Sequence, residues 1–164
     1  MSEITSSQAT SKYLNSQRLR LHYRDWGNPN APPLLLVHGG FDHCRSWDWA
    51  AEILCKDFHV IAPDLRGHGD SGWAAGNAYS MADYVYDMAE LIEQLDLSPV
   101  AIIGHSLGGA IALKYTGAFP GKVKQLVAIE GLVPPQNMLE ENVAPPAQKL
   151  ARWVKQEQRT VNRP

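Results

Sequence analysis

The chain has 164 residues, enough for one domain with a single hydrophobic core. Its formal net charge of −2 argues against the strongly basic surface by which proteins bind nucleic acids or anionic membranes. Two cysteines are too few for a disulfide framework in a chain of this length, so we expect Cys44 and Cys55 to be free, buried thiols.

The first forty residues pass from a polar segment to two strand patterns. Residues 1–16 are rich in Ser, Thr and Gln, and we expect them to form a mobile tail. In residues 18–24, Leu and Tyr alternate with Arg and His, which is the period of a half-buried strand. After a turn, residues 34–40 read LLLVHGG, which is typical of a central strand that is buried on both faces and ends in glycines.

The middle of the chain contains two helix patterns. Residues 46–57 have apolar side chains at helical spacing, and Ser46 is placed to cap that helix. Residues 79–97 show the same spacing more clearly and begin with a capping box formed by Ser80 and Asp83.

Apolar strand patterns alternate with these helices. They lie in residues 58–72, 98–106 and 123–132, and one more helix pattern, over residues 107–119, stops before Pro120. The alternation predicts an α/β fold, with a mostly parallel sheet and helices on both faces. In such sheets the functional residues gather at the carboxyl ends of the strands.

A Gly-x-Ser-x-Gly sequence lies between the apolar strand and the apolar helix at Ser106. A sharp strand-to-helix turn forces its middle residue into strained backbone geometry, and it closes only if Gly104 and Gly108 carry no side chain. The turn would lift the Ser106 hydroxyl clear of the sheet, near the positive end of a helix. The backbone N–H of Leu107 would then face an anion that forms beside Ser106.

This turn resembles the nucleophile elbow of the α/β-hydrolase superfamily. Further segments are similar to that family and occur in its order: LHYRDWG, LLLVHGG, APDLRGHGDSG and YSMADYVYDMAELIEQL. The resemblance covers residues 18–133. It implies the N-terminal part of an α/β-hydrolase fold, of the type that carries a cap.

The resemblance implies a serine hydrolase that acts on carboxylic esters or related acyl compounds through an acyl-serine intermediate. Ser106 would be the nucleophile. The elbow residues are Gly104, His105 and Gly108. The oxyanion hole would use the backbone N–H groups of Leu107 and Gly40, with Phe41 as the second choice to Gly40. Neither a metal nor an organic cofactor is implied.

The base and the acid of a catalytic triad are left open. The family's chain order is Ser, acid, His, but no histidine follows His105 in this sequence. Because adjacent residues on a tight turn point in different directions, we expect His105 to line the pocket or to have a structural role. Glu130 ends a strand at which some members of the family carry the acid; the alternative is a residue that lines or braces the pocket.

Three residues that follow the expected oxyanion strand are candidates for the substrate pocket. His43 would lie near its mouth, and Phe41 is a further residue expected to line it. Trp47 would form an apolar wall, with core packing as the alternative interpretation.

Other polar residues are expected to order loops. His38 and His68 would brace the loops that contain them, and Asp64 would bind loop backbone together with Arg66. His22 lies in a strand pattern, where a surface or packing role is expected. The spacing of the histidines does not indicate a zinc site.

The chain divides into three expected segments. Residues 1–16 are the mobile tail, residues 17–133 are the N-terminal portion of the hydrolase core, and residues 134–164 begin a cap or lid. Because the family's late strands follow its cap, the resemblance implies a chain that is truncated within the cap.

Two further interpretations compete with a hydrolase that acts by itself. The chain is either a non-catalytic scaffold that binds without turnover, or an enzyme that a second chain completes. The expected partner is a small-molecule acyl substrate, without a nucleic acid or a membrane, and an exposed sheet edge after residues 123–132 favours self-association. The polar N-terminus and the lack of a long apolar run favour a cytoplasmic location.

Overall fold

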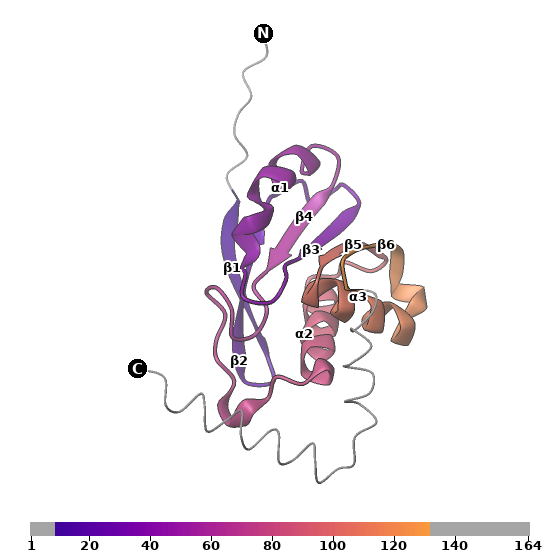
Figure 1. Cartoon of the computed structure of the whole chain (residues 1–164). Helices are drawn as coiled ribbons and strands as arrows, with labels where there is room; N and C mark the ends of the chain where they lie inside the picture. The colour runs from indigo at the N-terminus through magenta and orange to yellow at the C-terminus, as the bar shows by residue number, and fades with distance from the viewer. Residues whose placement is uncertain (1–8, 132–164) are drawn as a thin grey trace. The chain divides into compact units, whose positions relative to one another are not determined.

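The computed structural model describes residues 9–131. They form a six-stranded sheet in the order β1-β2-β4-β3-β5-β6, with helices on both of its faces (Figure 1). The strands are β1 Thr10–Ser16, β2 Leu19–Asp25, β3 Pro33–Val37, β4 His59–Pro63, β5 Val100–His105 and β6 Val123–Ile129. The helices are α1 Asp48–Leu54, α2 Met81–Gln94 and α3 Leu107–Ala118, with short 3-10 helices η1 Cys44–Trp47, η2 Ala75–Asn77 and η3 Pro120–Lys122.

The sheet is mostly parallel, as the sequence predicts. The neighbouring pairs β4 and β3, β3 and β5, and β5 and β6 are all parallel, whereas β2 joins β4 in antiparallel orientation. Parallel neighbours need a crossover, which α1, α2 and α3 provide. The segment expected to begin a cap, residues 134–164, lies outside the described residues.

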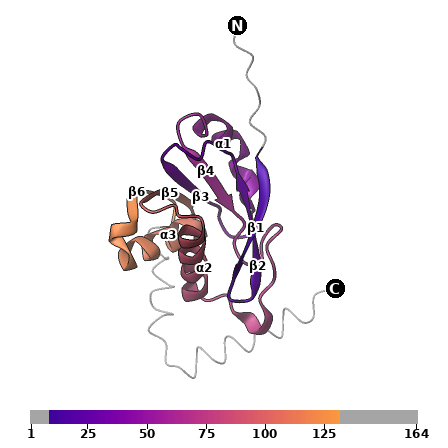
Figure 2. The same ribbon diagram turned by 180° about the vertical axis from the view of Figure 1, so that it is seen from behind.

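The expected tail is wrong for residues 10–16. They form β1, which pairs with β2 in an antiparallel hairpin along one edge of the sheet (Figure 2). The two-residue turn is made by Gln17 and Arg18, both with a positive φ, whereas the usual sequence signal for such a turn is Asn-Gly or Asp-Gly. The hairpin is held by long-range contacts: Leu14 is buried in the core, and the Ser16 hydroxyl donates a 2.6 Å hydrogen bond to Asp87.

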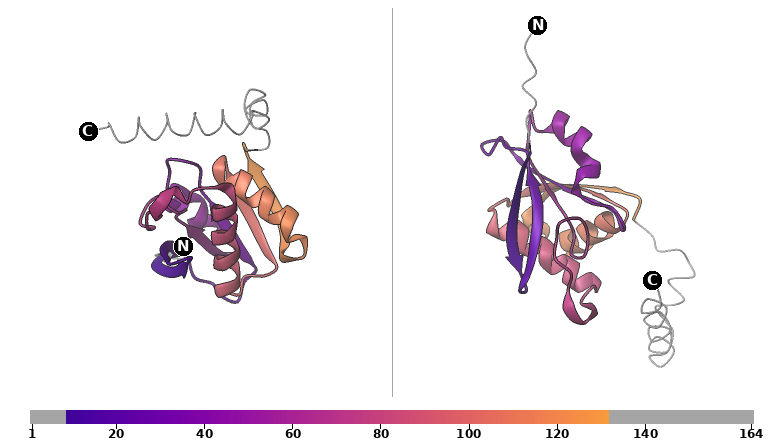
Figure 3. Two further views of the ribbon diagram at one scale, coloured as in Figure 1. Left: turned by 90° about the horizontal axis from the view of Figure 1, so that it is seen from below. Right: turned by 90° about the vertical axis from the view of Figure 1, so that its left-hand side faces the viewer.

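Successive residues of the central strands pack into two different cores. Leu34 and Leu36 of β3 contact the cluster under α1, which includes Ala51. Leu35 and Val37 contact the larger cluster under α2 and α3. Figure 3 shows α1 on one side of the sheet and α2 and α3 on the other. Both faces are therefore covered, which is why these strands are continuously apolar.

Of the two predicted N-terminal caps, the one at α2 is confirmed and the one at α1 is wrong. The capping box of Ser80 and Asp83 at α2 is confirmed. Ser46 does not cap α1, because the 3-10 helix η1 precedes it and the Ser46 hydroxyl donates to the His43 carbonyl instead. The expectation of two free, buried thiols at Cys44 and Cys55 is confirmed.

Candidate active site

Ser106 occupies a strained turn between β5 and α3. Its backbone angles are φ 49° and ψ −112°, in the left-handed region that non-glycine residues rarely adopt. The Ser106 amide donates to the Ile129 carbonyl at 2.8 Å, and the Ser106 carbonyl accepts from the Ala110 amide at 3.0 Å. The residue is exposed, so the turn presents its side chain to solvent at the carboxyl edge of the sheet.

The glycines on either side of Ser106 are needed because backbone atoms contact them. A Cβ atom on Gly104 would lie 2.6 Å from the carbonyl oxygen of Gly108, and one on Gly108 would lie 2.4 Å from that of Val37. Both distances are far below normal van der Waals contact. Since backbone cannot move aside as a flexible side chain can, the elbow closes only with glycine at both positions.

The loop after β3 lies against this elbow. A Cβ atom on Gly39 would be 3.4 Å from the Ser106 Cβ, and one on Gly40 would be 3.9 Å from the Leu107 Cδ2. Leu107 is the first residue of α3, so its amide belongs to the N-terminal turn of that helix. The fold therefore brings together Ser106 and both residues predicted to form the oxyanion hole.

A pocket of about 190 Å³ opens beside the elbow, on the α1 side of the sheet. Its lining residues are His38, Asp42, Ser46, Trp47, His105 and Ile129. Of the three predicted substrate-pocket residues, only Trp47 is among them. Phe41, the second choice for the oxyanion hole, is fully exposed with φ 60°. The His43 ring accepts a hydrogen bond from the Arg45 amide and so caps η1.

His105, which lines this pocket, forms a pair with Glu130. Their closest approach is 3.7 Å, from Nε2 of His105 to Oε2 of Glu130, and 83% of the Glu130 side chain is exposed. Glu130 also has a positive φ of 49°. Ala101 and Ile103 pack on the α1 side of β5, and His105 has the same alternation. The imidazole thus belongs to the pocket wall on that side.

His38 joins the oxyanion loop to the loop after β4. It is completely buried; its Nε2 accepts from the Leu65 amide at 2.9 Å, and its Nδ1 lies 2.7 Å from the Gly39 carbonyl. Since Nε2 is the acceptor, Nδ1 carries the proton and donates it to Gly39. Burial lowers the pKa of the His38 imidazole, which keeps it neutral. The expected bracing role of His38 is confirmed.

A buried cluster of His22, Cys44 and Asp64 was missed by sequence reasoning. Nδ1 of His22 lies 2.7 Å from Oδ2 of Asp64, and the Cys44 amide donates to Oδ1 of Asp64 at 2.6 Å. Burial acts to raise the pKa of the Asp64 carboxyl, but the amides of Cys44 and Asp70 and the His22 ring outweigh it, so that this pKa is lowered. The three residues lie on separate elements, so spacing carries no signal for their meeting.

The donor atoms of His22, Cys44 and Asp64 all lie within 4.8 Å of one another, as the ligands of a metal ion would. Both Asp64 oxygens are already engaged, Oδ1 by the Cys44 amide and Oδ2 by the Asp70 amide and the His22 ring. Burial beside Asp64 also raises the pKa of the Cys44 thiol, which opposes the thiolate that a metal would need. We therefore interpret the cluster as a hydrogen-bond network.

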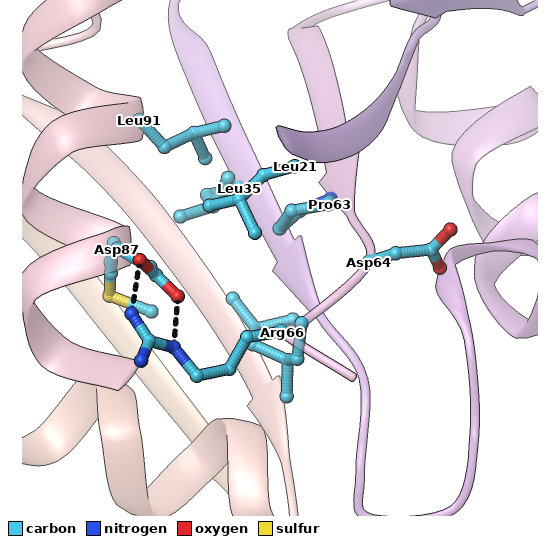
Figure 4. A pocket seen from close by; sticks show the side chains of 10 residues that line it. Leu21, Leu35, Pro63, Asp64, Arg66, Asp87 and Leu91 are labelled. Atoms are coloured by element: carbon cyan, nitrogen blue, oxygen red, sulfur yellow. Dashed lines mark hydrogen bonds and ion pairs between the residues drawn. The ribbon is translucent and has the colours of Figure 1, made fainter. Parts of the chain in front are cut away.

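The expectation that Asp64 binds loop backbone is confirmed by the amides of Cys44 and Asp70, but the expectation that Arg66 takes part in this contact is wrong. Arg66 is 1% exposed and instead forms two hydrogen bonds with Asp87 of α2, at 2.6 and 2.7 Å. Figure 4 shows the two side chains face to face, with the Asp64 carboxylate pointing the other way. They border a small cavity of about 20 Å³ between apolar side chains of the larger core. Asp87 is 21 residues away from Arg66 in the sequence, so only the fold brings the two together.

Within residues 9–131, the structure contains no helix that is long and apolar enough to cross a membrane. A cytoplasmic location and the absence of a membrane partner stay predictions.

Known proteins share this architecture. A sequence model described as alpha/beta hydrolase fold matches residues 32–162. An uncharacterized protein of Mycobacterium tuberculosis is 40% identical over 100 residues, which are 61% of this chain and 29% of that protein. The 3-hydroxybutyrate-oligomer hydrolase of Cupriavidus necator is 37% identical over 110 residues, 66% of this chain and 38% of that enzyme.

A comparison with solved structures also finds similar proteins. The thioesterase domain from the curacin biosynthetic pathway matches with a TM-score of 0.75 at 27% sequence identity, over 83% of this chain and 51% of that one. The chain therefore spans about half or less of the length of these three proteins, with shares of 29%, 38% and 51%.

Proposed function

Because this chain belongs to the α/β-hydrolase family, we propose that it carries the nucleophile of a serine hydrolase, and that Ser106 is that nucleophile. The observation that supports this most directly is the exposed Ser106 on a strained turn that only glycines can close. Strain of this kind persists where a function requires one orientation of a side chain.

The proposed reaction is acyl transfer to water. The Ser106 oxygen attacks the carbonyl carbon of the substrate, and the negative charge that develops on the carbonyl oxygen is stabilised by the amides of Gly40 and Leu107. Loss of one such donor typically raises the barrier by about 3 kcal/mol. The Ser106 proton ends on the alcohol or thiol that leaves, and water then cleaves the acyl-serine bond, which releases the carboxylic acid and restores the Ser106 hydroxyl.

Carboxylic esters and thioesters are the proposed substrate class. One relative is named for the hydrolysis of 3-hydroxybutyrate oligomers, and one matching structure is a thioesterase domain. Both names describe transfer of a carboxylic acyl group. A serine, rather than an aspartate, at residue 106 agrees with an acyl-enzyme intermediate.

We assign His105 to the pocket wall rather than to the base of a triad, and we do not assign Glu130 as its acid. The alternation of β5 directs His105 to the α1 side, and Glu130 is its exposed partner. Since no histidine follows His105 in the sequence, a second candidate function is a scaffold that binds acyl compounds without turnover.

Steady-state hydrolysis of p-nitrophenyl acetate separates the two candidates. For the enzyme, Ser106→Ala should reduce the rate to that of uncatalysed hydrolysis, whereas Ser11→Ala, an exposed serine of β1, should leave it unchanged. Equal rates in the unaltered chain and in Ser106→Ala would leave the binding scaffold and the enzyme that a second chain completes. A stoichiometric acetyl adduct on Ser106, detected by mass spectrometry, would establish the intermediate directly.

A further inference from the structure

The loop that carries Gly40 is fixed at each end to one of two neighbouring residues, Leu65 at its start and Asp64 at its end. At its start, His38 accepts a hydrogen bond from the Leu65 amide at 2.9 Å. At its end, the Cys44 amide donates to the Asp64 carboxylate at 2.6 Å. We propose that Asp64 is a positioning residue that orients the oxyanion loop, residues 39–43, and through it the Gly40 amide beside Ser106. This inference rests on the proposed function of Ser106.

Asp64 is built to hold more than one segment in place. Besides the Cys44 amide, it accepts from the Asp70 amide at 2.9 Å and from the His22 ring at 2.7 Å, and it is 2% exposed. The chain wraps closely around it, because a Cβ atom on Gly69 would lie 2.2 Å from the Asp64 carboxylate. A charged, fully hydrogen-bonded carboxylate therefore joins β2, the oxyanion loop and the loop after β4 at one point.

The oxyanion loop needs such an anchor because it contains a strained residue. Phe41 has φ 60° although it is not glycine, and its side chain is fully exposed, so its own contacts do not hold this conformation. Strained backbone persists only where the surrounding structure determines it from outside. The bonds at His38 and Cys44 supply that restraint, and Gly40 lies between them, directly before Phe41.

A substitution at Cys44 can remove the hydrogen bond between the Cys44 amide and the Asp64 carboxylate without a mutation of Asp64. Cys44 is the first residue of η1, a position that proline favours. His43 before it is extended, with φ −154° and ψ 169°, as a residue before proline must be. Cys44→Pro therefore removes the amide donor, and because the proline Cδ takes the place of the N–H, Oδ1 of Asp64, which lies 2.6 Å from that nitrogen, must move away. Cys44→Ala is the matched control, because it removes the thiol and keeps the amide.

Backbone order and turnover should both separate the two variants. We expect ¹⁵N order parameters of Gly40 and Asp42 of about 0.85 in Cys44→Ala and below about 0.6 in Cys44→Pro. We also expect kcat for p-nitrophenyl acetate at least about tenfold lower in Cys44→Pro than in Cys44→Ala, with KM within about twofold, because the donor acts on the transition state. A loop that stays ordered in Cys44→Pro, or a mobile loop with unchanged kcat, would overturn the proposal.

Two further results keep this inference separate from the proposed function. If the unaltered chain shows no Ser106-dependent hydrolysis, the proposed function fails, while the order parameters still test the anchoring. If Cys44→Pro does not fold, amide hydrogen exchange in the unaltered chain decides. The Cys44 amide should then be protected as strongly as the amides of β3, and a freely exchanging Cys44 amide would contradict an anchor at Asp64.

Discussion

The elbow and the loop after β4 solve the same packing problem in opposite ways. Both turn the chain sharply at the carboxyl edge of the sheet. In the elbow, Gly104 and Gly108 have no side chains, so their backbone packs directly against other backbone atoms. The loop after β4 instead buries charge: Asp64 and Arg66 are 2% and 1% exposed, and each is surrounded by hydrogen-bond partners.

This difference determines which changes each region tolerates. An added atom in the elbow meets backbone that cannot move away, whereas a removed atom leaves little unsatisfied. In the loop a removed group leaves a buried charge or amide without its partner, which costs more than the lost contact itself. Substitutions that add side-chain atoms should therefore destabilise the elbow most, and substitutions that remove a polar group should destabilise the loop after β4 most.

The largest effect is expected for Asp87→Ala. It leaves the buried Arg66 guanidinium without its two hydrogen bonds to a carboxylate, and breaking a buried pair in this way costs about 3–5 kcal/mol of unfolding free energy. Glu93→Ala on the same helix also breaks a bond to a cation, Lys122, but at the solvent-exposed surface, and should change stability far less. Urea denaturation measures both, and equal midpoints for the two variants would mean that burial of the pair is unimportant.

Gly108→Ala is expected to come next, with a loss of about 3 kcal/mol, because its new Cβ would meet the carbonyl oxygens of Val37 and His38. Gly117→Ala is the matched control near the end of the same helix. A Cβ atom there meets nothing within 4 Å, so it should stabilise the protein by about 0.5–1 kcal/mol through helix propensity. If both variants shift the unfolding midpoint in the same direction, backbone contact does not explain the glycine at residue 108.

The pH dependence of stability should carry the signature of His38. Burial holds its pKa in the folded state below the ordinary value of about 6.5. The unfolded chain therefore binds this proton first as the pH falls. The stability contribution is fully present above about pH 6.5 and is lost as the pH decreases toward the folded-state pKa, by at most about 1.4 kcal/mol per pH unit.

His38→Gln should remove this part of the slope while lowering stability at neutral pH. The measurement is the free energy of unfolding in urea between pH 7.5 and pH 5, for example at about half-unit steps, for both proteins. Parallel curves would show that His38 has the same pKa in the folded and unfolded chains.

The smallest effect tests the strain at the nucleophile. Ser106→Gly should stabilise the protein by about 1 kcal/mol relative to Ser106→Ala, because glycine adopts the observed φ of 49° without a Cβ penalty, although it loses more entropy on folding. Ser106→Ala keeps the Cβ and is therefore the reference. Equal thermal midpoints for the two variants would mean that the turn is not strained.

Features that depend on neighbours in sequence were predicted well. The elbow glycines, the capping box at Ser80 and the apolar strands follow from local backbone sterics and from the two periodicities of buried side chains. Their physical cause lies within a few residues, so one sequence is enough to recognise it. The same holds for the fold class, because alternating strands and helices permit few topologies.

Features that depend on contacts between distant segments were not predictable. Residues 10–16 contain little strand signal, and they become β1 only because β2 and Asp87 are there to receive them. The sequence by itself determined that Ser106 would lie on a sharp turn between a strand and a helix, with glycines two residues before and after it. Only the tertiary structure decided that Arg66 pairs with Asp87 and that Asp64 binds the distant Cys44 amide, because a buried charge takes its partner from whatever the folded chain brings within hydrogen-bond distance.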